Sequence, residues 1–288
     1  MSTTADNNYY VPHGTIWPFI GSVGLSTLMG GFIVLLNGGT NGKYFMIAGA
    51  LILIYMLFGW FGEVIAESEN NTYHSWEDKS FRLGMSWFIF SEVMFFACFF
   101  GALFYTRVLS VPWLAGAGDE FETNRLLWEG FQAAWPTNGP GNVGGDYEPM
   151  SWKGLPAINT LILLTSGVTV TWAHHAIKKD NRKHLIIGLF LTVTLGYLFV
   201  FLQAIEYKEA YHTGLTLGSG VYGSTFFMLT GFHGLHVTLG AIMLTVVLFR
   251  SMKGHFTPKN HFAFEASAWY WHFVDVVWLG LFIFVYIL

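Results

Sequence analysis

The 288-residue chain is short of charge and of cysteine. Charged residues make up only 11% of it, against about 25% in a typical soluble domain, while 53% are apolar. The one cysteine, Cys98, excludes an internal disulfide, a CxxC redox pair and an iron–sulfur centre held by cysteines. A net charge of −4 leaves no electrostatic footprint for a nucleic-acid partner. Together with a mean hydropathy of +0.47 and 18% aromatic residues, this composition predicts an integral membrane protein.

Long stretches without Asp, Glu, Lys or Arg mark the predicted membrane spans, because about 20 apolar residues are needed to cross a bilayer core. Five stretches contain none of these residue types, and two more contain a single acid, Glu92 or Asp275. We therefore predict an all-α integral membrane protein in which residues 1–288 form one seven-helix membrane domain. The approximate spans are 14–37, 43–65, 82–107, 155–178, 184–207, 222–250 and 266–288, with an outer loop at 108–154.

Basic residues are divided unevenly between the two ends of these spans, and this sets the expected orientation. Nine lie on the side of the N-terminus and five on the other side. Because cytoplasmic loops carry an excess of Lys and Arg, we expect a cytoplasmic N-terminus and a periplasmic C-terminus. The first residues show no basic n-region and no cleavage pattern, so we expect the first span to be retained. The expected location is a bacterial inner (plasma) membrane, with the mitochondrial inner membrane as the less favoured alternative.

Glu92 is an acid about ten residues into the third predicted span, in FIFSEVMFFACFF, roughly 15 Å deep by helical rise. An ionised carboxylate at that depth is costly, so we expect a buried protonatable acid. Such an acid could exchange protons or bind a lipid or a partner. Alternatively, it is a protonated residue that is hydrogen-bonded to a neighbouring helix.

Two pairs of polar residues are three positions apart, so each pair shares a helix face. His272 and Asp275 suit an acid–base site, although a buried structural clasp is the commoner arrangement. His233 and His236 could ligate a transition metal, but two imidazoles do not complete a site, and the nearby glycines favour close helix packing with interhelical hydrogen bonds. The adjacent histidines at 174–175 point about 100° apart on a helix, which favours a polar helix end. We therefore expect no metal site in this chain.

Several functional motifs are lacking. The sequence has no HExxH, GxSxG, P-loop or dinucleotide-binding motif. The seventh span has no lysine for a retinal Schiff base, and the two acids at Glu92 and Asp275 do not make the charged ladder of a channel or pump. Arg250 and Lys253 follow the sixth span, where anionic lipid head groups would lie, although the positive-inside rule alone would also place them there.

Four long motifs lie from the third predicted span onward. They are FIFSEVMFF around Glu92, TWAHH at 171–175, GVYGSTFFMLTGFHGLHV at 220–237 and FEASAWYWHFVDVVWL at 264–279. These motifs, with weaker matches such as LQAIEY at 202–207, resemble subunit III of the haem–copper cytochrome c oxidases.

This resemblance implies a non-redox core subunit of an aa3-type oxidase in aerobic electron transport. In that family the haem and copper belong to partner subunits, and the complex reduces O2 to water and pumps protons. The chain would stabilise subunit I, bind structural phospholipids, support proton uptake and assist O2 access. The implied partners are subunit I as the main contact, subunit II, a small subunit IV as a further candidate, and cytochrome c as electron donor to the complex. Helices 1–2 and helices 3–7 would form two bundles around a lipid-filled V-shaped cleft.

The resemblance also implies roles for individual residues. Glu92 matches the family's buried glutamate, which reacts with carbodiimides. Five residues match positions associated with lipid head groups, namely Glu67, His74, Arg82, Arg250 and Lys253. Four match positions with a structural role between helices or against subunit I, namely His233, His236, His272 and Asp275. No residue of this chain is expected to be catalytic or to hold a cofactor.

Three alternative functions remain open, one within the superfamily that the chain resembles and two from the residues themselves. The first is subunit III of a quinol oxidase, which the two well-formed leading helices disfavour. The second is an independent proton-coupled transporter that uses Glu92 and Asp275. The third is a membrane metalloenzyme or haem protein that uses His233, His236 and His272. The resemblance favours the cytochrome c oxidase subunit over all three.

Overall fold

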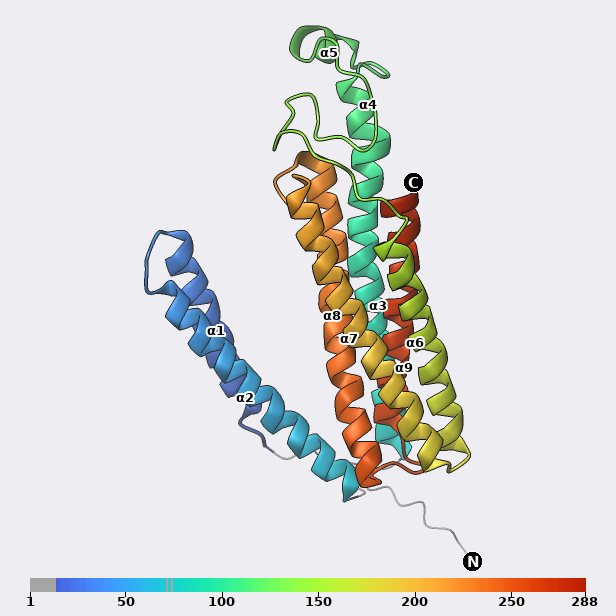
Figure 1. Ribbon diagram of the computed structural model, residues 1–288. Coiled ribbons are helices and arrows are strands. Elements are labelled where there is room, and N and C mark those ends of the chain that lie inside the picture. The colour runs from blue at the N-terminus through green and yellow to red at the C-terminus, as the bar shows by residue number, and fades with distance from the viewer. Residues whose placement is uncertain (1–13, 71, 74) are drawn as a thin grey trace, which may run out of the picture. The chain divides into compact units, whose positions relative to one another are not determined.

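The computed structural model describes residues 14–70, 72–73 and 75–288, and the regular structure in this part of the chain is helical (Figure 1). The helices are α1 Trp17–Leu36, α2 Gly42–Glu69, α3 Ser75–Phe104, α4 Val111–Leu114, α5 Phe121–Leu127, α6 Leu155–Lys178, α7 Arg182–His212, α8 Gly220–Lys253 and α9 Phe262–Leu281. Two π-helical segments, Tyr105–Ser110 and Phe282–Ile287, continue α3 and α9. The chain forms two compact units, one up to Phe81 and one from Arg82.

Within the described residues, seven helical stretches are long and apolar enough to cross a membrane, which confirms the predicted fold class and number of spans. The third stretch, Ser75–Leu114, is 40 residues long because the π-helical turn carries α3 directly into α4. It therefore begins before the predicted span at 82–107 and extends into the segment expected to be a loop. The short helix α5 also lies in that segment.

Helices α1 and α2 of the first unit pack against each other as a pair (Figure 1). Their backbones come closest at glycines. Gly24 and Gly31 share one face of α1, and Gly42 and Gly49 share one face of α2, because each pair is two turns apart. A Cβ atom added at Gly49 would lie only 2.5 Å from the backbone nitrogen of Leu28. In lipid, where apolar side chains gain little by leaving solvent, this close approach of small residues supplies the packing energy.

We expect Gly31→Val to separate α1 from α2, at a cost of about 1–3 kcal/mol or more. A Cβ atom at Gly31 would lie 2.6 Å from the backbone nitrogen of Met46, which cannot rotate away. Gly30→Val is a matched control, since a Cβ there would meet nothing within 4 Å. The measurement is amide hydrogen exchange of the two helices. Faster exchange is expected only in Gly31→Val, and equal protection in both variants would contradict the packing described here.

The core of the second unit lies among α6, α7, α8 and α9, with Trp271 of α9 at its centre. Trp271 is fully buried. Its ring lies against two glycines, where added Cβ atoms would be 2.6 Å away from it at Gly196 of α7 and 2.8 Å away at Gly240 of α8. Its indole N–H donates to the Ser166 hydroxyl of α6 at 2.8 Å. One side chain therefore contacts three other helices.

Helix α3 joins the second unit through large aromatic side chains. The Phe88 ring stacks on Tyr270 of α9, and the Phe95 ring meets Phe232 of α8 edge-on with centroids 5.1 Å apart. Phe96 is buried and lies against the His236 ring, with centroids 5.0 Å apart. These contacts place the acid of α3, Glu92, beside α8.

Part of the long connection between α4 and α6 is fixed to the start of α8. The Tyr147 ring stacks on Tyr222 of α8, and Trp135 meets the same ring edge-on. The backbone N–H of Tyr222 donates to the Thr137 carbonyl at 3.3 Å. Burial raises the pKa of the Tyr147 phenol. This part of the connection is therefore a packed cover over one end of the bundle.

Candidate functional site

Glu92, the acid within the third membrane helix, pairs with His236 of α8. Its Oε2 atom lies 2.9 Å from His236 Nε2. The histidine is buried, whereas the glutamate side chain is 22% exposed. The other ring nitrogen of His236, Nδ1, donates to the Phe232 carbonyl at 2.6 Å. Both residues are candidates from the sequence, but their spacing in the chain does not predict that they pair.

The hydrogen bonds of this pair determine how many protons it holds. Because Nδ1 of His236 uses its proton on a carbonyl, Nε2 of a neutral ring can only accept, so Glu92 must donate. If the proton moves, the pair becomes a carboxylate beside an imidazolium. In either form the two residues share one proton. Four aromatic rings lie around the imidazole of His236, those of Phe95, Phe96, Tyr270 and Phe273.

His233, one turn earlier on α8, connects α8 to α9. It is buried, and its Nε2 atom donates to the Val274 carbonyl at 3.1 Å. Its ring lies between Phe199 of α7 and Trp278 of α9, with centroids 5.7 and 5.1 Å away. The two histidines of the predicted His-x-x-His pair therefore have different partners and do not converge on one ligand position.

His272 and Asp275 lie together on α9 and contact α6. His272 Nδ1 is 3.5 Å from Asp275 Oδ2, and its Nε2 is 3.2 Å from the hydroxyl oxygen of Thr171. Asp275 also lies against Gly167 of α6, where an added Cβ atom would be 2.4 Å from the carboxylate. These residues line an open depression of about 540 Å³ between the two helices. The His272 side chain remains 45% exposed there.

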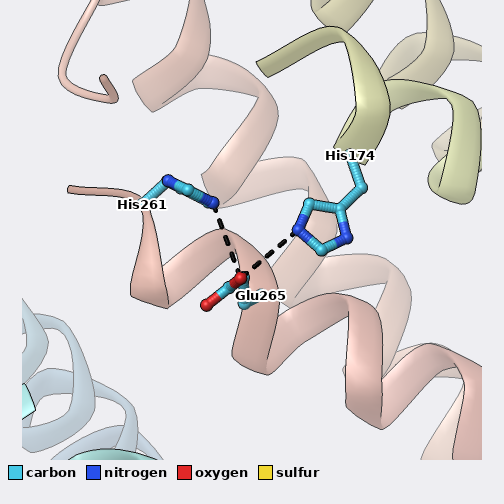
Figure 2. A group of neighbouring side chains, drawn as sticks. All are labelled: His174, His261 and Glu265. Carbon is cyan, nitrogen blue, oxygen red and sulfur yellow. Dashed lines mark ion pairs between the residues drawn. The ribbon is translucent and has the colours of Figure 1, made fainter. Parts of the chain in front are cut away.

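A second polar cluster lies where α6 ends and α9 begins (Figure 2). Glu265 Oε2 accepts a hydrogen bond from the Arg82 guanidinium, and its other oxygen, Oε1, lies 3.4 Å from His174 Nε2 and 3.6 Å from His261 Nε2. Sequence reasoning considered Arg82 and His174 singly and missed the two others. The available signal was the spacing of His261 and Glu265, four residues apart and thus on one face at the start of α9.

The residues predicted to bind lipid head groups have these contacts. Glu67, in the first unit, accepts a hydrogen bond from the Tyr73 hydroxyl, and Arg82 pairs with Glu265. The Arg250 guanidinium lies 4.6 Å over the Phe256 ring, and Lys253 is exposed at the end of α8. The predicted His74 lies outside the described residues.

One buried acid was missed by the sequence analysis. Glu206 of α7 is fully buried, and the Tyr286 hydroxyl donates to its Oε1 atom at 2.6 Å. The predicted span at 184–207 placed this glutamate at a helix end, where an acid needs no partner. In fact α7 continues to His212, so Glu206 is covered by the last turns of the C-terminal helix. The only signal was the short motif LQAIEY.

Comparison with known proteins gives one consistent result. The family model for cytochrome c oxidase subunit III matches residues 7–118 and 129–288. The chain is 39% identical to cytochrome c oxidase subunit 3 of Halichoerus grypus over 279 residues, which cover 96% of each protein. The same values hold for the protein of Equus caballus. For that of Eudorcas rufifrons, 39% identity extends over 285 residues, or 99% of this chain and 98% of the relative. The chain therefore belongs to the cytochrome c oxidase subunit III family.

Proposed function

We propose that this chain is the non-redox core subunit of an aa3-type oxidase, and that its main task is to hold and stabilise subunit I. The observation that carries this proposal is the polar depression between α6 and α9. His272 lies ten residues after the start of α9, about 15 Å along the helix, and its side chain is 45% exposed.

Exposure of these groups at mid-membrane depth requires a partner. A polar side chain that faces lipid without a hydrogen bond is unfavourable by several kcal/mol. Thr171 and Asp275 each contact one ring nitrogen of His272, but the depression stays open on its outer side and leaves part of the imidazole exposed. Because the chain is a subunit of an oxidase complex, a helix of subunit I is the partner that covers this face.

Replacing His272 by leucine tests this docking face. The change keeps a side chain of apolar bulk but removes the polar contact, which is worth about 1–2 kcal/mol between membrane helices. We expect a roughly 5- to 30-fold weaker association of the chain with the oxidase, measured as the fraction retained through detergent washing. Turnover of the washed enzyme should also decay sooner, because more molecules lack this subunit.

Phe201→Leu is the control for this experiment. Phe201 lies on α7, is 61% exposed, and does not line the depression. We expect Phe201→Leu to be retained like the unaltered chain. Equal retention of His272→Leu and Phe201→Leu would contradict docking through this face.

Other parts of the proposed role rest on further residues. The shared proton of Glu92 and His236 supports proton uptake by the complex. Arg250 and Lys253, at the end of α8, bind phospholipid head groups, and Glu67 does so in the first unit. Haem and copper belong to the partner subunits, which are subunit I and subunit II. A small subunit IV completes the assembly, with cytochrome c as donor. The bound lipid gives O2 access to the complex.

The proposed orientation follows from the excess of basic residues at one end of the spans. Lys178 ends α6, and Arg250 and Lys253 lie in the last turn of α8. These residues face the cytoplasm of a bacterium, and the N-terminus lies on the same side.

A further inference from the structure

We propose that His174, His261 and Glu265 form a binding site for a divalent transition-metal ion, most suitably Zn²⁺. The site lies within one compact unit, where the last turn of α6 meets the start of α9. One ligand atom of each residue can be chosen so that all lie within 4.8 Å of one another. Both imidazole rings direct a nitrogen toward the same carboxylate (Figure 2). This proposal is independent of the docking role proposed above.

The hydrogen bonds of His261 leave its Nε2 atom available as a ligand. Its Nδ1 atom is 3.1 Å from the Thr257 carbonyl, to which it donates. That bond places the ring proton on Nδ1 and the free lone pair on Nε2, an arrangement typical of metal-binding histidines. His261 is only 8% exposed. Among the described residues, the Nε2 atoms of His261 and His174 accept or donate no hydrogen bond, and each faces Glu265 Oε1 at ion-pair distance. A buried nitrogen without a partner is costly, and a metal ion would supply one.

The two carboxylate oxygens of Glu265 have different partners. Its Oε2 atom accepts from Arg82, which leaves Oε1 to face the two histidines. A bond to the metal would therefore use one oxygen only. The ion pair with Arg82 also holds the carboxylate in position before any metal arrives.

The distances within the cluster fit a tetrahedral ion. Zinc bonds to nitrogen and oxygen are about 2.0–2.2 Å long, so neighbouring ligand atoms of a tetrahedral site lie about 3.3 Å apart. The observed separations from Glu265 Oε1 are 3.4 Å to His174 Nε2 and 3.6 Å to His261 Nε2. Rotation of the two rings would bring their nitrogens together. His174 is only half-buried, so water can reach the fourth position.

The identity of the ion follows from the ligands. Two imidazoles and one carboxylate suit zinc, whereas magnesium and calcium prefer sites made of oxygen alone. Arg82 and Lys178 add positive charge near the cluster, which weakens binding but is partly offset by Glu265. A bound ion would link the end of α6 to the start of α9, next to the depression that contains His272.

The test uses the purified oxidase that contains the full chain, stripped with a chelator and then dialysed against ZnCl₂. We expect the unaltered complex to bind one zinc ion per chain more than the complexes with His174→Asn or His261→Gln. His212→Ala is the control, because it removes an exposed histidine at the end of α7, away from the cluster and from the depression, and should leave zinc binding unchanged. Haem content per complex reports whether each variant has assembled.

X-ray absorption of the zinc-loaded unaltered complex gives a readout that needs no variant. The proposal predicts a component with two imidazole ligands that is missing from the His174→Asn complex. It is overturned if zinc uptake is equal in all complexes, or if His212→Ala lowers it as much as His174→Asn does. If neither site variant assembles, the X-ray absorption spectrum of the zinc-loaded unaltered complex decides. A spectrum without two imidazole ligands on zinc overturns the proposal.

Discussion

Replacing Trp271 by alanine is expected to lower the free energy of unfolding of the second unit by about 3 kcal/mol. Removal of a buried tryptophan costs about 3–5 kcal/mol in soluble proteins, partly through transfer to water and partly through the cavity that remains. In a membrane the transfer contribution is smaller, since lipid already solvates the side chain, and the lower end of the range applies. The cavity here is bordered by two helix backbones, at Gly196 and Gly240, which cannot collapse into it easily.

The measurement for Trp271 is unfolding of the purified chain in mixed detergent, followed by loss of helicity. Trp87→Ala is the control, because Trp87 of α3 is 68% exposed and borders no such gap. Similar losses in the two variants would show that the fit of Trp271 between three helices contributes little. The variant also loses the hydrogen bond to Ser166, and a further Ser166→Ala measurement separates that contribution.

The infrared spectrum of the protein is expected to contain a protonated carboxyl band that disappears in Glu92→Gln. The geometry requires one proton on the pair of Glu92 and His236, and with a neutral imidazole whose Nδ1 donates to the Phe232 carbonyl this proton is on Glu92. Glutamine can still donate from its amide group to His236 Nε2, so this variant should assemble normally. Leucine cannot donate, so Glu92→Leu should destabilise the bundle by about 1–3 kcal/mol by leaving a buried nitrogen unpaired.

The control for the infrared experiment is Glu209→Gln, near the end of α7. It removes one carboxyl group without touching the pair, and the band should persist. A spectrum of Glu92→Gln identical to that of the unaltered protein would show that the proton is not on Glu92. Equal stability of the glutamine and leucine variants would show that the hydrogen bond to His236 is unimportant.

The sequence allowed the membrane helices to be predicted better than their contacts. Seven apolar stretches are visible because lipid imposes a length and a composition on each span, and both can be read locally. The ends of the helices were less predictable, because a helix can continue beyond the apolar stretch that crosses the membrane. The third helix continues to Leu114 through a π-helical turn, and α7 continues to His212.

The pairs within the site depend on contacts that sequence spacing does not reveal. Glu92 and His236 are 144 residues apart, so their hydrogen bond depends on how α3 and α8 pack. His233 and His236 share a helix face, yet one bonds to α9 and the other to α3. The ion pair of Arg82 and Glu265 likewise joins α3 to α9, and nothing in the positions of the predicted spans indicates that these two residues meet. Local patterns identify polar residues in the membrane, and tertiary packing decides which of them meet.

We propose above that this chain is a subunit without redox centres that stabilises its partners in the oxidase. The most direct measurement is purification in gentle detergent through a tag on this chain, with visible spectra and turnover recorded before and after the chain is stripped away. We predict that the haem absorbance stays with the other subunits, and that turnover is at first retained but then decays within the assay. Haem or copper that travels with the isolated chain, a colourless preparation without partners, or unchanged durability of the stripped enzyme would contradict this role.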